Sequence, residues 1–163
     1  MIRFIIVTIS DSTVAGTRED KSGPALKARL EQLGWSVVGT SLLPDELPQI
    51  AAALKHMADR GETDVILTTG GTGVAPRDIT PEATRSIADR DIPGFGEVMR
   101  SEGRKSTQLA PLSRGGACTR GSTLIVNLPG SPRGAIESLD AVAELIPHVV
   151  DLLHGRTEHF AKL

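Results

Sequence analysis

The stretch LTTGGTGVAPRD, from Leu67 to Asp78, carries the strongest structural signal in this sequence. A β-branched run that begins at Asp64 leads into its paired glycines, and the chain leaves it toward Thr80-Pro81, where a helix is predicted to start. This order predicts a strand, a glycine-built loop and a helix. When such a loop follows a buried parallel strand, backbone N–H groups and the helix N-terminus favour binding of a phosphate or another anion.

Three glycines, Gly70, Gly71 and Gly73, give this loop access to positive φ and let a ligand approach its backbone. No Lys-Ser or Lys-Thr pair follows the loop, and no further glycine completes the dinucleotide pattern G-x-G-x-x-G. The glycines and threonines alone support a tight turn and a ligand loop equally. Arg77 and Asp78, directly downstream, favour the ligand loop.

The composition excludes several classes of function. The chain has 163 residues, 39% of them hydrophobic, and a formal net charge of -2, which predicts one domain over residues 1–163 that binds no nucleic acid and no membrane. With three Phe, one Trp and no Tyr, it offers almost nothing on which bases could stack. The single cysteine, Cys118, forms neither an internal disulfide nor a cysteine zinc cluster, so we expect a reducing, cytoplasmic location.

Hydrophobic patterning predicts an α/β fold. Strands are expected at 2–9, 35–43, 64–69 and 123–127, with a weak strand between Gly115-Gly116 and Arg120-Gly121 in the otherwise undetermined region 101–121. The first helix is expected from an N-cap at Ser22 to Gly34, and the second ends at Gly61. A third runs from Thr80-Pro81 to a break at Asp91-Ile92-Pro93, and a fourth from Gly94 through Met99. The last helix contains Ile136 and Ile146 and restarts at Pro147. Strands that alternate with helices in this way form a mostly parallel, Rossmann-like sheet.

Polar residues follow each predicted parallel strand. Because these carboxyl ends meet at one edge of a sheet, the segments should form one rim with Arg77 and Arg133 nearby: Ser10-Asp11, Pro44-Asp45-Glu46, the corner at 70–78, and Asn127, Leu128, Pro129, Gly130, Ser131 and Pro132. Taken singly, Asp45 fits a helix N-cap or a turn residue after proline, and Asp78 fits a turn or a partner of Arg77. Together the two aspartates predict a site for Mg²⁺ between carboxylate and phosphate oxygens.

This set of residues suits phosphate chemistry without a general base. The histidines, which are assigned to helices or the tail as packing or solvated residues, do not compete for a softer metal: His56, His148, His154 and His159. If nucleophile and leaving group are both phosphates, the nucleophile is already ionised. Catalysis then consists of positioning and charge neutralisation, for which Asp, Arg, glycine amides and a metal suffice.

Several ordered motifs resemble one known family over nearly the whole chain. LTTGGTG followed by APRDITPEAT, then IPGFGEVMR, LSRG and IVNLPGSPRGA, are similar to the MogA/MoaB molybdopterin adenylyltransferases of molybdenum-cofactor biosynthesis. The resemblance implies a three-layer α/β sandwich and oligomers built on trimers. It also implies transfer of AMP from Mg-ATP to the terminal phosphate of molybdopterin, with release of pyrophosphate, and a molybdenum insertase as a downstream partner.

The resemblance also implies roles for particular residues. Asp45 and Asp78 match the acidic positions regarded as catalytic. Nucleotide- and pterin-binding positions fall on the rim, on the serine of LSRG and on the basic residue after the second corner: Ser10, Asp11, Gly70, Gly71, Thr72, Gly73, Arg77, Ser113, Asn127, Pro129, Gly130, Ser131 and Arg133. The chain lacks the extra segment that longer adenylyltransferases carry after the NLPG corner, so it is of the short, MoaB-like type.

Three functions compete at this point. The first is the enzyme, and the second is a non-catalytic oligomeric protein that binds molybdopterin and hands it on. Retention of both Asp45 and Asp78 favours the enzyme. The third, a nicotinamide-dependent Rossmann enzyme, lacks its glycine pattern. The sequence does not distinguish a homotrimer from a hexamer, molybdenum from tungsten, or one nucleotide from another.

Overall fold

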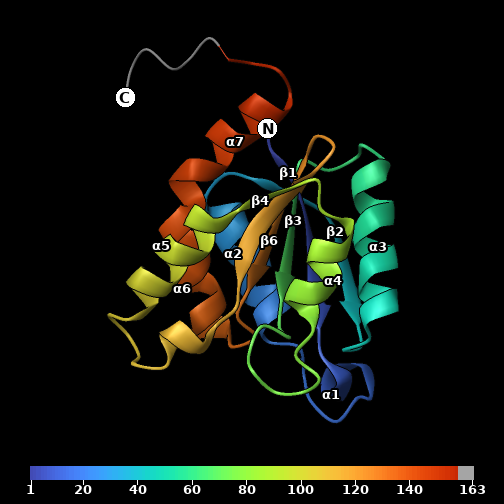
Figure 1. Cartoon of the computed structure of the whole chain (residues 1–163), viewed down its shortest axis with the longest axis vertical. Helices are drawn as coiled ribbons and strands as arrows, with labels where there is room; N and C mark the ends of the chain where they lie inside the picture. The colour runs from blue at the N-terminus through green and yellow to red at the C-terminus, as the bar shows by residue number, and fades with distance from the viewer. Residues whose placement is uncertain (158–163) are drawn as a thin grey trace.

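A computed structural model describes residues 1–157 and contains a six-stranded sheet. The strands run in the order β2-β1-β3-β6-β5-β4, and the ribbon shows helices on both faces of the sheet (Figure 1). Their bounds are β1 Arg3–Ile9, β2 Ser36–Leu43, β3 Val65–Thr69, β4 Arg90–Ile92, β5 Gly116–Arg120 and β6 Thr123–Leu128. The first four strands of the order pair in parallel, whereas β5 is antiparallel to both of its neighbours.

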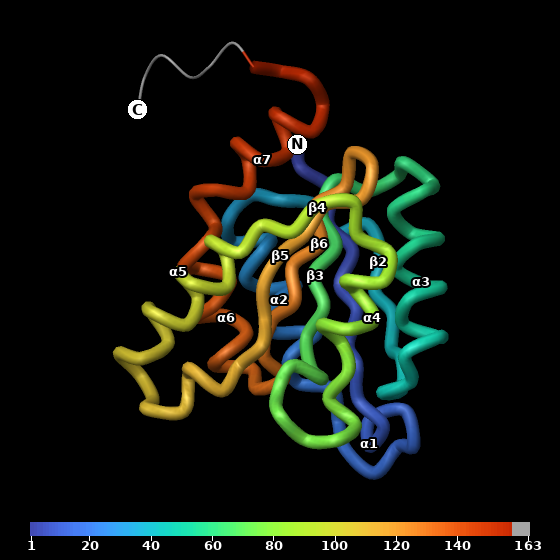
Figure 2. The backbone as a smooth tube through the Cα atoms, in the orientation of Figure 1, coloured from blue at the N-terminus to red at the C-terminus, as the bar shows by residue number. Residues whose placement is uncertain are grey.

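Helices form two layers that enclose the sheet, as the tube trace shows (Figure 2). The helices are α1 Asp11–Val14, α2 Ser22–Gln32, α3 Leu47–Asp59, α4 Thr80–Ile87, α5 Pro93–Gly103, α6 Pro132–Val142 and α7 Ile146–Leu153, with 3-10 turns at Ala110–Leu112 and Ala143–Leu145. Two buried clusters explain this arrangement. Val65 and Leu67 pack with α2, α5, α6 and α7, whereas Ile66 packs with α3 and α4. Successive side chains of β3 therefore point to opposite faces of the sheet and pack into two separate cores, which confirms the three-layer α/β fold.

One local prediction is wrong, and another is incomplete. Ser22 is not an N-cap, because it lies inside α2, and Asp20 instead accepts the hydrogen bond of the Gly23 N–H at 3.0 Å. Asp91-Ile92-Pro93 is not only a helix break, because Arg90–Ile92 forms the edge strand β4, in which Asp91 pairs with Cys118 of β5. A three-residue strand with two charged residues has too little apolar pattern to be recognised in the sequence.

Other local signals are confirmed. Gly34 and Gly61 have positive φ after their helices, the weak strand forms as β5, and the last helix restarts at Ile146 before Pro147. No helix within residues 1–157 has both the length and the apolar character needed to cross a bilayer. The assignment of His159 falls outside the described residues.

Asp64 ties the start of β3 to the N-terminal strand. Its side chain, 7% exposed, accepts from the Arg3 backbone N–H at 2.8 Å and from the Arg3 guanidinium at 2.9 Å, and it lies 3.4 Å from His154. Burial acts to raise the pKa of Asp64, but the hydrogen bonds and charge of Arg3 outweigh it, so the pKa lies below its ordinary value. Ionised Asp64 therefore stabilises the fold above its unfolded-state pKa.

We expect Asp64→Asn to lower the free energy of unfolding at pH 7 by about 1 to 3 kcal/mol, because it removes one partner of a buried ion pair. The loss should shrink as the pH falls through the folded-state pKa, where wild-type Asp64 also becomes neutral. Urea unfolding at pH 7 and at about pH 3 measures this difference. Asp151→Asn, which affects the exposed pair with Arg156, is the control and should change little at either pH.

Candidate functional site

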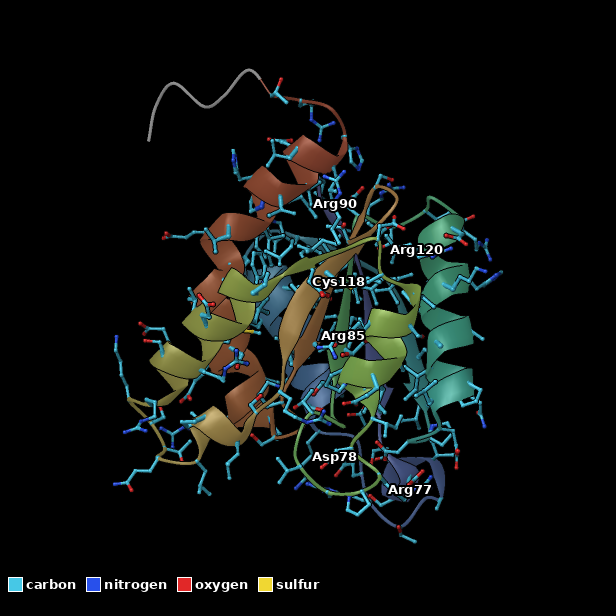
Figure 3. All side chains as sticks on the ribbon, viewed as in Figure 1. Arg77, Asp78, Arg85, Arg90, Cys118 and Arg120 are labelled. Atoms are coloured by element: carbon cyan, nitrogen blue, oxygen red, sulfur yellow. The ribbon has the colours of Figure 1, made fainter. Side chains whose placement is uncertain are left out.

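The carboxyl ends of the parallel strands surround a pocket of about 370 Å³. It lies at the end of the sheet where Figure 3 shows Asp78 and Arg77, which is the end that carries α1 in Figure 1. Seven of the predicted site residues line it together: Ser10, Asp45, Gly70, Gly71, Asp78, Gly130 and Ser131. The structure thus brings both aspartates and both glycine corners to a single pocket.

Close packing explains the glycines of the first corner. Gly70 and Gly71 have φ of 107° and 67°, in the region that side chains disfavour. A Cβ on Gly70 would lie 2.2 Å from the Ile9 carbonyl oxygen, and one on Gly71 would lie 2.2 Å from Thr80 Oγ1. A Cβ on Gly130 would lie 3.2 Å from Gly70 Cα, so the two corners touch at their backbones. Because these three residues have no side chains, only their backbone atoms cover the strand ends, and this backbone lines the pocket.

Asp45 is held by a reciprocal pair of hydrogen bonds with Asp11. The Asp11 N–H donates to Asp45 Oδ2 and the Asp45 N–H donates to Asp11 Oδ1, both at 3.0 Å. The N-cap alternative for Asp45 is wrong, because Glu46 occupies that position of α3. Burial raises the pKa of Asp45, and the negative charges of Asp11 and Asp78 add to this rise. A nearby cation would reverse the effect.

Asp78 closes its own loop. Its Oδ2 accepts from the Ala75 N–H at 3.0 Å, which is the turn-forming contact predicted as one alternative. Asp78 does not pair with Arg77. The Arg77 guanidinium instead contacts Asp11 at 2.6 Å, Glu46 at 2.8 Å and the Asp45 carbonyl at 3.1 Å. Within residues 1–157, neither Asp45 Oδ1 nor Asp78 Oδ1 accepts a hydrogen bond, so each aspartate keeps a free oxygen.

The second corner is fixed by polar contacts beneath it. Asn127, 4% exposed, donates through Nδ2 to Thr68 Oγ1 at 2.8 Å and to Thr84 Oγ1 at 3.1 Å. Thr69 Oγ1 donates to the Pro129 carbonyl at 2.7 Å, and Ser131 caps α6 by accepting from the Gly134 N–H. Asn127 therefore holds the corner in place from below, and it borders a different pocket from that of the aspartates.

Further hollows continue from the first pocket. Ser131 is shared with a hollow of about 180 Å³ that Pro129 and Leu109 also line. Ser113 is shared between that hollow and a pocket of about 530 Å³ bordered by Asn127. The predicted pterin-side residues thus line hollows that share Ser113 with each other and Ser131 with the pocket of the aspartates.

Several predicted binding residues lie outside the pockets. The Arg133 side chain, 77% exposed, pairs with Glu137, and Arg77 is engaged as described above. Thr72 is buried, and Gly73 lies against Asp78, where an added Cβ would be 2.7 Å from Oδ2. None of these four, nor Asp11, lines the pocket of the aspartates. The basic residues that do line it are Arg18 and Lys21.

Sequence reasoning missed Arg18 and Lys21. Both lie in the loop between α1 and α2, and the available signal was a charged loop directly after the first strand end. Cys118 is excluded as a nucleophile, because burial, together with the charges of Asp91 and Asp89, raises the pKa of its thiol to about 12.

The arrangement fits a divalent cation that bridges protein and ligand. Within residues 1–157 there is no group of three or more His, Cys, Asp or Glu side chains that could hold a metal ion alone. Mg²⁺ is commonly bound by one or two carboxylates, with phosphate oxygens and water completing its coordination. Asp45 and Asp78, each with a free oxygen, match that pattern.

Fold and site together define an α/β protein whose strand-end pocket suits a phosphorylated ligand. The chain belongs to the family described as "Probable molybdopterin binding domain", whose model matches residues 5–148. The predicted resemblance to this family is confirmed.

Three similar proteins illustrate the match. A Helicobacter pylori protein named molybdopterin adenylyltransferase is 41% identical over 156 residues, which cover 94% of this chain and 89% of that protein. The Drosophila molybdenum cofactor synthesis protein cinnamon is 42% identical over 154 residues, and this chain spans 26% of its length. The crystal structure of the molybdopterin biosynthesis enzyme MoaB from Thermus thermophilus is 50% identical, with a TM-score of 0.89 over 95% of this chain and 98% of that one.

Proposed function

We propose that this protein acts in molybdenum-cofactor biosynthesis and transfers AMP from ATP to the terminal phosphate of molybdopterin. The observation that carries the proposal is the meeting of Asp45 and Asp78 with both glycine corners in one pocket. The names of similar proteins support the proposal. Proteins named molybdopterin adenylyltransferase are 38% identical to this chain in Haemophilus influenzae and 40% identical in Escherichia coli, over most of its length.

The reaction requires little proton transfer. An oxygen of the molybdopterin phosphate, already ionised at neutral pH, forms a bond to the α-phosphorus of ATP. The bond from that phosphorus to the oxygen bridging to the β-phosphate breaks, and pyrophosphate leaves with the electron pair. The protein must therefore align two anions and offset their charge.

Each part of the pocket has a role in this alignment. The backbone of Gly70 and Gly71 lets phosphate oxygens approach closely, and the exposed side chains of Arg18 and Lys21 supply positive charge. Asp45 and Asp78 would hold Mg²⁺ through their free oxygens. When bound, the ion neutralises charge on the phosphate oxygens as negative charge develops on the leaving group.

The hollow beyond Ser131 is assigned to the pterin. Pro129 and Leu109 contribute apolar lining to it, and Ser113 and Ser131 contribute polar groups. This division places the pterin on one side of the aspartates and the nucleotide on the other. By resemblance, the protein assembles as a homotrimer or hexamer and delivers its product to a molybdenum insertase.

The alternative, a carrier that binds molybdopterin without chemistry, is not favoured. A carrier needs no pair of carboxylates beside a phosphate loop, because two negative charges there weaken binding of an anionic ligand in the absence of a cation. Asp45 and Asp78 are explained by a cation-assisted transfer.

Incubation of the purified protein with molybdopterin and Mg-ATP labelled at the α-phosphate tests the proposal. We expect label in adenylyl-molybdopterin and release of one pyrophosphate for each product molecule. Reactions without molybdopterin and with EDTA are the controls and should form none. Tight binding of molybdopterin with no labelled product under these conditions would favour the carrier.

A further inference from the structure

Arg114 contacts the loop that carries Asp78 at several points. It lies between Ser113 and β5, and its backbone N–H donates to the Thr72 carbonyl at 2.8 Å. Its Nε donates to the Gly73 carbonyl at 2.8 Å, and its Nη2 donates to the Asp78 carbonyl at 2.6 Å. The same guanidinium pairs with Glu82 in the first turn of α4. One side chain therefore bonds both ends of the loop.

Arg77 anchors the other side of the loop through its bonds to Asp11, Glu46 and the Asp45 carbonyl, whereas the side facing β5 and α4 is held by Arg114. Residues 74–77 have exposed side chains, Val74 at 70%, and form neither helix nor strand. Inside the loop, the Asp78 N–H donates to the Ala75 carbonyl at 2.9 Å, and the Ala75 N–H donates to Asp78 Oδ2. These internal bonds fix the carboxylate relative to the loop. The bonds from Arg114 fix the loop relative to β5 and α4.

We propose that Arg114 is a positioning residue for AMP transfer, which sets the place of the Asp78 carboxylate in the pocket by holding the Gly73 and Asp78 carbonyls. This inference rests on the function proposed above. A guanidinium is planar and directs five N–H donors in fixed directions, so it can bond two carbonyls and a carboxylate at once. A lysine ammonium keeps the charge but has no such fork, so it cannot hold all three acceptors.

Arg120, the last residue of β5, provides a matched control at the end of the strand far from Arg114. It donates to the Ile87 carbonyl at 2.8 Å and pairs with Asp59 through two nitrogens, at 2.7 and 3.0 Å. It is also an arginine that joins a carbonyl to a carboxylate, but it lies at the opposite end of the sheet from Asp78 (Figure 3). Arg114→Lys and Arg120→Lys thus remove the same kind of contact near the site and far from it.

We expect Arg114→Lys to lower kcat by about tenfold to a hundredfold while KM for ATP changes by less than about threefold, because displacement of a catalytic group by a fraction of an ångström mainly affects the transition state. Arg120→Lys should keep kcat within about twofold of wild type. Equal losses in the two variants would show a general effect of stability and would overturn the proposal.

A double variant tests whether Arg114 acts through Asp78. In an Asp78→Asn background, Arg114→Lys should cost less than about twofold further, since the carboxylate that it positions is already gone. A full repeat of the single-variant loss would overturn the proposal. If Arg114→Lys does not fold, Glu82→Gln weakens the same anchor and should show a smaller loss with the same dependence on Asp78.

Amide exchange tests the positioning without any activity. By NMR, the backbone amides of Ala75 and Asp78 should exchange with solvent about tenfold faster in Arg114→Lys than in wild type, and at the wild-type rate in Arg120→Lys. Faster exchange in a protein whose wild type transfers no AMP would support Arg114 as the anchor of the loop and refute the proposed function. An active wild type with unchanged exchange and kcat in Arg114→Lys would overturn the positioning role alone.

Discussion

Replacing either Asp45 or Asp78 with asparagine is expected to lower AMP transfer by about a hundredfold or more, since each change removes a charge that would hold the cation against the phosphates. Both carboxylates line the same pocket, and each keeps an oxygen free of hydrogen bonds within residues 1–157. The double variant should lose little beyond the worse single one, because the two act as a unit. Product formation at saturating ATP, with Mg²⁺ titrated, measures these losses.

Stability separates this loss of activity from damage to the fold. The raised pKa of Asp45 means that its neutral form favours folding, and that this contribution disappears as the pH rises through the folded-state pKa. Asparagine stays neutral and its Oδ1 can still accept from the Asp11 N–H. Asp45→Asn should therefore melt at or above the wild-type temperature at pH 7, with the gain vanishing in acid below the unfolded-state pKa.

The control for activity is Asp140→Asn, an exposed aspartate that pairs with Arg29 on the surface of α6. It should transfer AMP like wild type. Near-wild-type transfer by Asp45→Asn or Asp78→Asn would contradict the metal assignment. If an inactive variant also melts at a lower temperature than wild type, its loss of activity is explained by damage to the fold.

The strand ends and glycine corners could be predicted from the sequence because they are local features. Hydrophobic runs locate the strands, paired glycines locate the corners, and the geometry of a parallel sheet brings Asp45 and Asp78 to one edge. These inferences need no knowledge of side-chain partners.

The partners themselves could not be predicted. Arg77 reaches Asp11, 66 positions away, and Arg114 reaches Asp78, 36 positions away, so no local spacing indicates either contact. For the same reason, the sequence assigned Arg77 and Arg133 to the ligand, whereas the arginine that lines the pocket is Arg18. Positive charge near a site is common, and only packing shows which cation faces it.

Gly71 shows how packing changes a prediction. Its sequence context suggests that a side chain there mainly blocks a ligand. In the structure, the space is already filled, since a Cβ would lie 2.2 Å from Oγ1 of the buried Thr80 and 3.1 Å from Asp45 Oδ1. Thr80 cannot easily move, because its Oγ1 donates to the Gly70 carbonyl and its N–H donates to the Gly71 carbonyl. A substitution must therefore disturb both the fold and the position of Asp45.

We expect Gly71→Ala to lower the free energy of unfolding by about 2 to 4 kcal/mol, the sum of a positive-φ cost and an overpacking cost, and to abolish most AMP transfer. Gly61→Ala isolates the first cost, because Gly61 has φ of 69° and nothing within 4 Å of an added Cβ. That control should lose only about 1 kcal/mol and keep its activity. Urea unfolding of the two variants gives the difference in stability directly. If they unfold at the same urea concentration, the corner has room for a side chain and Thr80 does not restrict it. If Gly71→Ala is less stable, adding Thr80→Ala should restore part of the lost stability, because the clashing oxygen is then absent.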